Sequence, residues 1–208
     1  MNVIKTKIDG LVIIEPKLFV DERGYFFESF NQRDFTSVVG NVTFVQDNES
    51  KSSYGVIRGL HFQKPPFAQS KLVRCVKGAV LDVAVDIRKE SPTYGQYVEC
   101  LLCAHDEEGS RIAKEYAGHT LKCQLSTFNC QLGQQLYIPK GFAHGFVVLS
   151  QQTVFQYKCD EFYHPEAEGA IAWNDPTINI DWQIPAEDII LSAKDKSHPM
   201  LHDITSPF

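Results

Sequence analysis

The 208-residue sequence predicts an all-β protein of the antiparallel sandwich or jelly-roll type. Short β-rich runs follow one another along most of the chain, and turn-forming residues separate them. Only residues 32–39 and 107–116 have a helical pattern, and both segments are short. The predicted strands cover residues 11–15, 25–30, 42–46, 71–77, 79–87, 96–103, 135–138, 145–149 and 154–159.

Turn-forming residues mark the ends of these strands. The segments Asp21–Gly24, Lys77–Gly78 and Pro139–Gly141 each contain the glycine that a tight turn favours. We expect the aromatic run Tyr25–Phe27 to be mostly core, because alternate side chains of a strand point inward. The run Val80–Arg88 is mostly apolar with two isolated aspartates, so it predicts a strand buried between sheets.

The segment from residue 105 to residue 132 departs from this alternation of strands and turns. It is long, polar and rich in charge near its start, and a connection of this length is unusual unless it has a structure or function of its own. No change in composition divides the chain into two parts. We therefore expect one domain over residues 1–208, with an insertion at about 105–132.

The charge balance argues against whole classes of partner. With a formal net charge of −6, the chain lacks the basic excess that general nucleic-acid binding needs. No apolar stretch is long enough to cross a bilayer, and the N-terminal residues lack the apolar core of an export signal. The sequence predicts a soluble cytoplasmic protein without nucleic-acid or membrane partners.

Six cysteines raise the question of a disulfide or a metal site. In a cytosolic protein, reduced thiols in the core are the default. The strongest metal pattern pairs Cys100 and Cys103 with Cys123 and Cys130, but two leucines between the first pair favour a continuing strand. A strand would send the two sulfur atoms to opposite faces, so structural zinc is not favoured.

Two histidines, His61 and His144, lie in apolar strand-like runs. A charged imidazole is costly there, so each ring needs a fixed hydrogen-bond partner or a ligand. Arg58 and Lys71 flank His61 in the sequence, a grouping that suits an anionic substrate. Each strand offers only one imidazole, and two neutral nitrogens make a weak transition-metal site, so we expect no metal.

Single imidazoles are well suited to proton transfer. His61 could be a general base oriented by a carboxylate such as Asp195, with Tyr157 as an acid of a different kind. Lys71 could stabilise a negative oxygen that develops on the substrate. The alternative for His61 taken alone is a hydrogen-bonded core histidine with no catalytic role.

Seven segments, in order along nearly the whole chain, match the motifs of one enzyme family: Asp21–Glu28, Gln46–Asn48, Arg58–Gln63, Ala68–Arg74, Ile138–Phe146, Tyr157–Cys159 and Leu191–Asp195. On these segments the chain resembles the dTDP-4-dehydrorhamnose 3,5-epimerases, which are cofactor-free enzymes of nucleotide-sugar synthesis. The resemblance implies a cupin-like double-stranded β-helix, or jelly roll, with short peripheral helices. It also implies a homodimer that exchanges strands near the N-terminus. The insertion departs from the family pattern.

The resemblance implies a role for each matched residue. His61 would remove a proton next to the C4 ketone of a dTDP-4-keto-6-deoxyhexose, with Asp195 as its partner. Lys71 would stabilise the enolate, and Tyr157 would return a proton from the opposite face, without cofactor or metal. The residues that would contact the nucleotide, diphosphate and sugar are Arg23, Glu28, Gln46, Asn48, Arg58, His144, Tyr163, Glu168 and Lys194.

Three alternatives stay open on the sequence. A mono-epimerase would invert only C3 or only C5 of a related nucleotide-linked 4-keto-6-deoxy sugar. A metal-dependent cupin isomerase or dioxygenase would share the fold but need bound metal for turnover. A nucleotide-sugar binding module would bind the same ligand without exchanging its ring protons.

Overall fold

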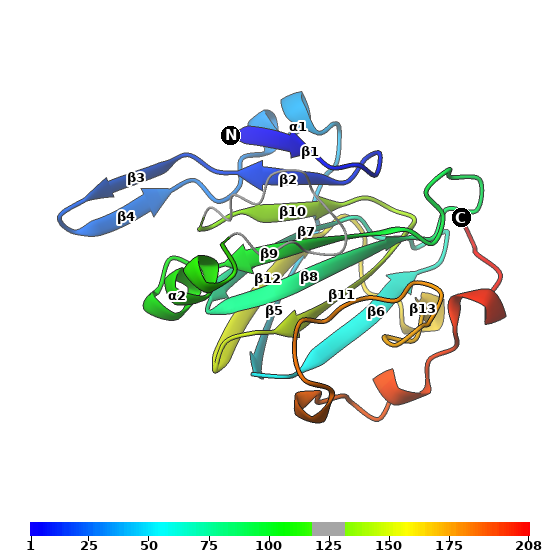
Figure 1. The fold of residues 1–208 in the computed structure, drawn as a ribbon. Helices are drawn as coiled ribbons and strands as arrows, with labels where there is room; N and C mark the ends of the chain where they lie inside the picture. The colour runs from blue at the N-terminus through cyan, green and yellow to red at the C-terminus, as the bar shows by residue number, and fades with distance from the viewer. Residues whose placement is uncertain (118–131) are drawn as a thin grey trace.

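Two antiparallel sheets face each other in the computed structural model, which describes residues 1–117 and 132–208 (Figure 1). The all-β jelly-roll prediction is confirmed, with two short peripheral helices, α1 (Gln32–Val38) and α2 (Glu107–Glu115). The six-stranded sheet runs in the order β1 (Asn2–Lys5), β2 (Val12–Glu15), β10 (Gln135–Ile138), β7 (Lys71–Lys77), β12 (Gln152–Cys159) and β5 (Gln46–Ser53). The five-stranded sheet runs in the order β13 (Glu168–Ala170), β6 (Ile57–Gln63), β11 (Phe142–Val148), β8 (Ala79–Asp86) and β9 (Tyr97–Cys103).

The main core lies between the two sheets. Val73 and Phe155 of the six-stranded sheet pack there with Val98, Phe142 and Phe146 of the five-stranded sheet. Burial of these apolar side chains supplies the main driving force that holds the sheets together. The two sheets therefore form a packed frame that can hold side chains in fixed positions.

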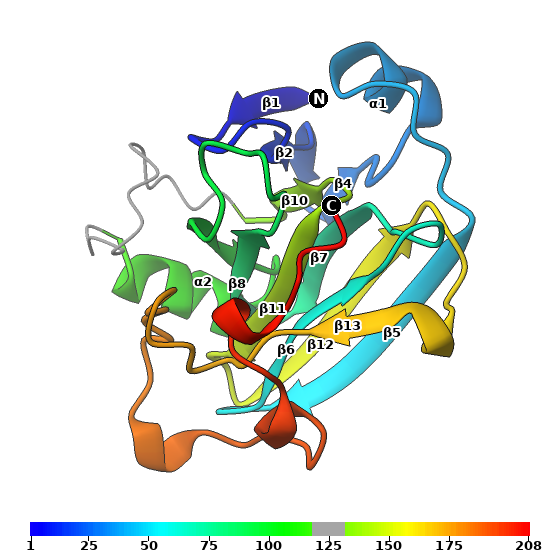
Figure 2. The same cartoon turned by 90° about the vertical axis from the view of Figure 1, so that its right-hand side faces the viewer.

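A second core covers the outer face of the five-stranded sheet. Figure 2 shows the C-terminal segment, orange to red, running across this face. Its Ile178, Trp182 and Leu201 pack on Leu81 and Val83 of β8, so every residue of β8 is buried. The predicted burial of this strand is confirmed, although only one of its faces lies between sheets and the other lies under the C-terminal segment.

The two thiols of the Cys100 and Cys103 pair lie on opposite faces of β9. Cys100 belongs to the core between the sheets, and Cys103 belongs to the core under the C-terminal segment. One metal ion cannot bind both sulfur atoms in this arrangement. The other two cysteines of the predicted pattern, Cys123 and Cys130, lie outside the described residues.

The prediction of a strand at residues 42–46 is wrong. The chain has no regular structure from 42 to 45, and strand β5 begins only at Gln46. Val42 and Phe44 instead pack beside α1 in a small cluster around the buried Phe35. The apolar pattern that predicted a strand therefore reflects contact with a helix.

A separate hairpin, β3 (Leu18–Asp21) and β4 (Gly24–Phe27), extends away from the two sheets (Figure 1). The expectation that Tyr25–Phe27 is mostly core is wrong, since Tyr25 is 51% exposed and Phe26 is 69% exposed. The hairpin pairs only with itself, so neither of its faces is covered by another sheet.

The turn after β8 is held by one buried carboxylate. Burial alone would raise the pKa of Asp86, but hydrogen bonds from Arg88, Ser91 and Thr93 outweigh it and lower the pKa to about 2. The lowered pKa means that Asp86 stabilises the fold above the ordinary carboxyl pKa, and that this contribution is lost as the pH falls towards 2.

We expect Asp86→Asn to lower the free energy of unfolding by about 2 kcal/mol near neutral pH. The difference from the unchanged protein should shrink as the pH falls through the acid range, because Asp86 then loses its charge. Urea unfolding at several pH values measures it. Glu90→Gln, an exposed change in the same turn, is the control and should leave stability unchanged. An equal loss of stability in both variants would show that the charge of Asp86 does not stabilise this turn.

The predicted insertion at about 105–132 lies only partly within the described residues. Its start contains α2, which matches the predicted helix at 107–116, and residues 118–131 are outside the described part. The single-domain boundary stays a prediction. Among the described helices, none combines the length and the apolar character needed to cross a membrane.

Candidate active site

Two adjoining cavities lie between the sheets, and His61, Lys71 and Tyr157 line both. One cavity measures about 300 Å³ and the other about 350 Å³, a size suited to small-molecule ligands. Their walls include β5, β7 and β12 from one sheet, β6 and β11 from the other, and the C-terminal segment. Eleven of the thirteen sequence-predicted site residues line them: Gln46, Asn48, Arg58, His61, Lys71, His144, Tyr157, Tyr163, Glu168, Lys194 and Asp195.

His61 on β6 contacts a carboxylate from the C-terminal segment. Its Nε2 lies 2.7 Å from Oδ1 of Asp195, although 134 residues separate the two in sequence. Ser192 donates a hydrogen bond of 2.7 Å to the other oxygen of Asp195, and the Asp195 backbone N–H donates to Ser192 Oγ at 3.1 Å. The carboxylate is therefore held at both oxygens, and the imidazole ring is oriented through it.

The electrostatics leave this imidazole neutral near pH 7. Burial lowers the pKa of His61 below its ordinary value of 6.5, and the nearby Asp195 offsets only part of that effect. Burial would raise the pKa of Asp195, but hydrogen bonds from Ser192 and His61 lower it, so the carboxylate is charged. With Nε2 donating to Asp195, the lone pair is on Nδ1, which has no hydrogen-bond partner among residues 1–117 and 132–208.

Lys71 and Tyr157 form the opposite wall. They lie on β7 and β12 of the six-stranded sheet, and Lys71 Nζ is 5.7 Å from the centre of the Tyr157 ring. Burial raises the pKa of Tyr157, so the phenol keeps its proton at neutral pH. Burial also lowers the pKa of Lys71, while nearby acidic groups oppose that change. The cavity thus has a neutral imidazole on one wall and a protonated phenol beside an amine on the other.

His144 lies next to His61 in the five-stranded sheet, where the two residues are register partners of β11 and β6. Its Nε2 is 3.0 Å and 2.9 Å from the two carboxylate oxygens of Asp82, which is fully buried on β8. Sequence analysis missed this partner. The only signal was an isolated aspartate in an apolar run, and its pairing depends on the alignment of β8 with β11.

Three charged or polar groups meet at the rim. Lys194 Nζ lies 2.5 Å from Oε2 of Glu168, and the Tyr163 hydroxyl donates to the same oxygen at 3.0 Å. The Tyr163 backbone N–H donates to the side chain of Gln46 at 3.0 Å. These bonds tie β5, β13 and the C-terminal segment together around the opening, so the rim offers polar groups in fixed positions.

Arg23 and Glu28 are the two predicted residues that do not line the cavities. Arg23 is at the tip of the β3–β4 hairpin, where its guanidinium group binds Asp21 and is 85% exposed. Glu28 follows the hairpin and accepts two hydrogen bonds of 3.1 Å from Asn31. Within one chain, neither side chain is part of the site around His61.

The described residues contain one group that could hold a metal ion. His61, Asp195 and His198 offer ligand atoms within 4.8 Å of one another. His198 was missed by sequence analysis, which counted one imidazole on each of two strands. Both imidazoles lie at hydrogen-bond distance from the same Asp195 oxygen, at 2.7 and 3.2 Å, so hydrogen bonds account for the cluster. That the site works without metal stays a prediction.

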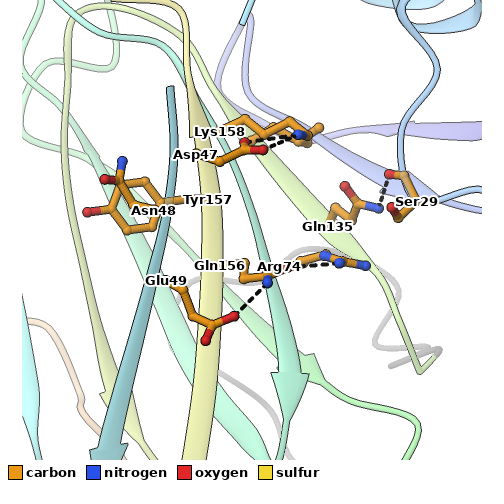
Figure 3. Close-up of a pocket in the computed structure, with 10 residues that line it drawn as sticks. Ser29, Asp47, Asn48, Glu49, Arg74, Gln135, Gln156, Tyr157 and Lys158 are labelled. Carbon is orange, nitrogen blue, oxygen red and sulfur yellow. Dashed lines mark hydrogen bonds and ion pairs between the residues drawn. The ribbon is translucent and has the colours of Figure 1, made fainter. Parts of the chain in front are cut away.

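A separate hollow lies on the outer face of the six-stranded sheet (Figure 3). Asp47, Arg74 and Lys158 point into it. Asn48 and Tyr157 line both this hollow and the cavity around His61. Because successive side chains of a strand point to opposite faces, Asp47 and Glu49 of β5 line only this hollow, whereas Gln46 and Ser50 line only the His61 cavities.

Comparison with known proteins identifies a family. The family model described as dTDP-4-dehydrorhamnose 3,5-epimerase matches residues 5–124 and 115–203. The dTDP-4-dehydrorhamnose 3,5-epimerase of Salmonella typhimurium is 50% identical over 205 residues, covering 97% of this chain and 96% of that protein.

Solved structures agree with the sequence comparison. The crystal structure of the dTDP-4-dehydrorhamnose 3,5-epimerase from Elizabethkingia anophelis matches with a TM-score of 0.81 and 46% identity, covering 98% of this chain and 97% of that one. A dTDP-6-deoxy-D-glucose-3,5-epimerase from Legionella pneumophila in complex with dTDP-4-keto-L-rhamnose matches with a TM-score of 0.81 and 43% identity, covering 98% and 94%. The chain therefore belongs to the dTDP-4-dehydrorhamnose 3,5-epimerase family.

Proposed function

We propose that the protein is an isomerase that converts dTDP-4-keto-6-deoxy-D-glucose to dTDP-4-keto-L-rhamnose. The observation that carries the proposal is the pair of proton carriers, His61 and Tyr157, on opposite walls of one cavity. Inversion needs a proton removed from one face of the ring and another added to the opposite face. The bound dTDP-4-keto-L-rhamnose of the Legionella pneumophila enzyme supports this choice of sugar.

The reaction begins with transfer of a proton from the carbon next to the C4 ketone to Nδ1 of His61. The electron pair of the broken C–H bond moves into an enolate, whose oxygen is stabilised by a hydrogen bond from the side-chain nitrogen of Lys71. Tyr157 then donates its phenolic proton to the same carbon from the other side. His61 returns its proton to solvent and Tyr157 regains one, so the protein is unchanged after each inversion.

The remaining cavity residues would bind the nucleotide and the sugar. Arg58 and Lys194 suit the diphosphate, since cationic side chains form charge-assisted bonds with phosphate oxygens. The other residues proposed to contact substrate within the same chain are Gln46, Asn48, His144, Tyr163 and Glu168.

Proton NMR of the reaction in deuterated water tests the function. Incubation with dTDP-4-keto-6-deoxy-D-glucose should replace the protons at C3 and C5 with deuterium and yield the L-rhamno product. Exchange and inversion at one carbon alone would show a mono-epimerase. Unexchanged ring protons would show a binding module and would overturn the proposal. Loss of turnover after removal of a stoichiometric metal would favour the metal-dependent alternative.

We infer that the protein acts as a homodimer in the cytoplasm and that the β3–β4 hairpin of one protomer reaches the partner's cavity. Four apolar side chains of this hairpin are 51% to 72% exposed: Phe19, Val20, Tyr25 and Phe26. An exposed apolar surface of this kind is typical of a protein interface. A second copy would also account for Arg23 and Glu28, which the resemblance assigns to substrate although neither lines the cavities of its own chain.

Mixing two inactive variants tests this sharing of sites. Arg23→Ala and His61→Ala should each have little activity alone. In a mixed dimer, the chain with intact His61 receives intact Arg23 from its partner, so equal mixing should restore about one quarter of the wild-type activity. Two chains that each carry both changes are the control. A mixture with no more activity than its components would exclude the shared site.

The midpoint of the acid limb in the pH profile of kcat/KM should lie below pH 6.5. The proposed base is active only when neutral, and burial lowers the pKa of His61, so kcat/KM should fall only when the pH drops below that lowered value. Initial rates over a pH series measure the limb, and a ¹⁵N NMR titration of His61 in the free protein should give the same midpoint. A limb above 6.5 would contradict the electrostatics of the site.

A further inference from the structure

A second imidazole binds the carboxylate that orients the proposed base. Nε2 of His198 lies 3.2 Å from Oδ1 of Asp195, the same oxygen that lies 2.7 Å from Nε2 of His61. The two imidazole rings are perpendicular, with an interplanar angle of 89° and 5.4 Å between centroids. The His198 side chain is 9% exposed. His198 therefore contacts both members of the pair without being among the residues that line the two cavities.

The backbone on both sides of His198 is fixed. The preceding turn is a 3-10 helix, Asp195–Ser197, and the following residue, Pro199, accepts a hydrogen bond of 2.8 Å from the backbone N–H of Ala172. Further along, the backbone N–H of Leu201 donates to the buried Asp175 at 2.6 Å. The imidazole is thus presented to Asp195 by an anchored segment, and its contact does not depend on a freely moving side chain.

We propose that His198 is a positioning residue that donates a hydrogen bond to Asp195 and packs against the ring of His61, thereby fixing the pair and limiting how strongly the carboxylate holds a proton on His61. This inference rests on the proposed function, in which His61 is the base. It adds a residue that acts through Asp195 and makes no contact with the substrate.

The expected effect on His61 follows from the groups that face it. They comprise Asp195, His198 and Lys194 from the C-terminal segment, Arg58 from β6, Lys71 from β7, Glu168 from β13, His144 from β11, Tyr157 from β12 and Tyr163, which follows β12. Without the His198 donor, Oδ1 of Asp195 would serve His61 alone and stabilise its protonated form more strongly. The direct effect of His198, which lowers the pKa of His61, would also be lost. Both changes raise the pKa of His61.

Two substitutions separate the hydrogen bond from ring packing. His198→Phe keeps an aromatic ring but has no N–H donor, whereas His198→Gln places an amide N–H near the position of Nε2. We expect His198→Phe to move the acid limb of kcat/KM up by about 0.5–1 pH unit and to lower kcat by about 10-fold with little change in KM. His198→Gln should restore the wild-type limb. His202→Phe, at a histidine whose side chain is 68% exposed, is the control.

A measurement on the unchanged protein keeps the inference testable if the Phe variant does not fold. The ¹⁵N shifts of the imidazole nitrogens should show a protonated Nε2 on His198 in the ligand-free protein, because that nitrogen must donate to Asp195. An unprotonated Nε2, or a wild-type acid limb in a folded His198→Phe protein, would overturn the inference. The NMR result needs no substrate, so it can stand even if the protein fails to turn over the proposed sugar.

Discussion

His61→Ala should abolish deuterium exchange at both C3 and C5 of dTDP-4-keto-6-deoxy-D-glucose. Every proton removal in the proposed reaction uses the imidazole on β6, and loss of a general base lowers rates by about 10²–10⁴-fold. Binding of the nucleotide should persist, since the other cavity residues remain in place. Proton NMR in deuterated water measures the exchange, and titration with dTDP measures the binding.

The control for this change is His202→Ala, which removes a histidine with a side chain that is 68% exposed. It should leave exchange and turnover unchanged. Added imidazole should restore part of the exchange to His61→Ala, because the small base can enter the space left by the ring. Normal turnover by His61→Ala would show that another group removes the proton.

The fold was largely predictable because most strands carry apolar side chains with a clear pattern. Strands β7 and β10 have the predicted bounds, and β8, β9 and β12 differ by two residues or fewer at each end. The short strands β1, β3 and β13 were not predicted, and neither was the long strand β5, in which Gln46, Asn48 and Ser50 alternate with charged residues. These inward side chains line the cavities and no apolar core, so hydrophobic periodicity gave no signal.

The site was predictable only in part. The resemblance implied that Asp195 is the partner of His61, whereas the residue pattern alone could not show a contact between residues 134 positions apart, because that contact depends on the course of the C-terminal segment. The same course brings His198 to Asp195, and the alignment of β8 with β11 brings Asp82 to His144. His198 and Asp82, which contact predicted site residues, belong to no sequence motif that was matched. Only the three-dimensional structure shows that these two residues lie beside residues identified from the sequence.

The β3–β4 hairpin differs from the rest of the site, because its motif-matched Arg23 does not line the cavities of its own chain. Arg23 was named by motif, and the fold leaves it on the exposed tip of β3 and β4. Its aromatic neighbours looked like core residues because alternation predicts that one face of a strand is covered. In the structure this hairpin pairs only with itself and its aromatic side chains are exposed, which alternation in the sequence could not indicate.

Tyr157→Phe should separate proton exchange from inversion. The change removes only the phenolic oxygen, so the ring keeps its packing near Lys71 and Phe155. His61 can still take a proton from the sugar and return deuterium to the same face, which gives exchange with retained configuration. Delivery to the opposite face loses its donor, and formation of the L-rhamno product should slow by about 10²–10⁴-fold.

The comparison of two rates makes this result specific. In the unchanged protein, inversion should keep pace with exchange, whereas in Tyr157→Phe the ratio of exchange to inversion should rise by about the same factor by which inversion slows. Tyr94→Phe, at a tyrosine that is 38% exposed and lies between β8 and β9, is the matched control and should change neither rate. If Tyr157→Phe slowed exchange and inversion equally, the phenol would act before or during proton removal. Its proposed place as donor on the far wall would then be wrong, because a group needed only for reprotonation cannot limit the first step.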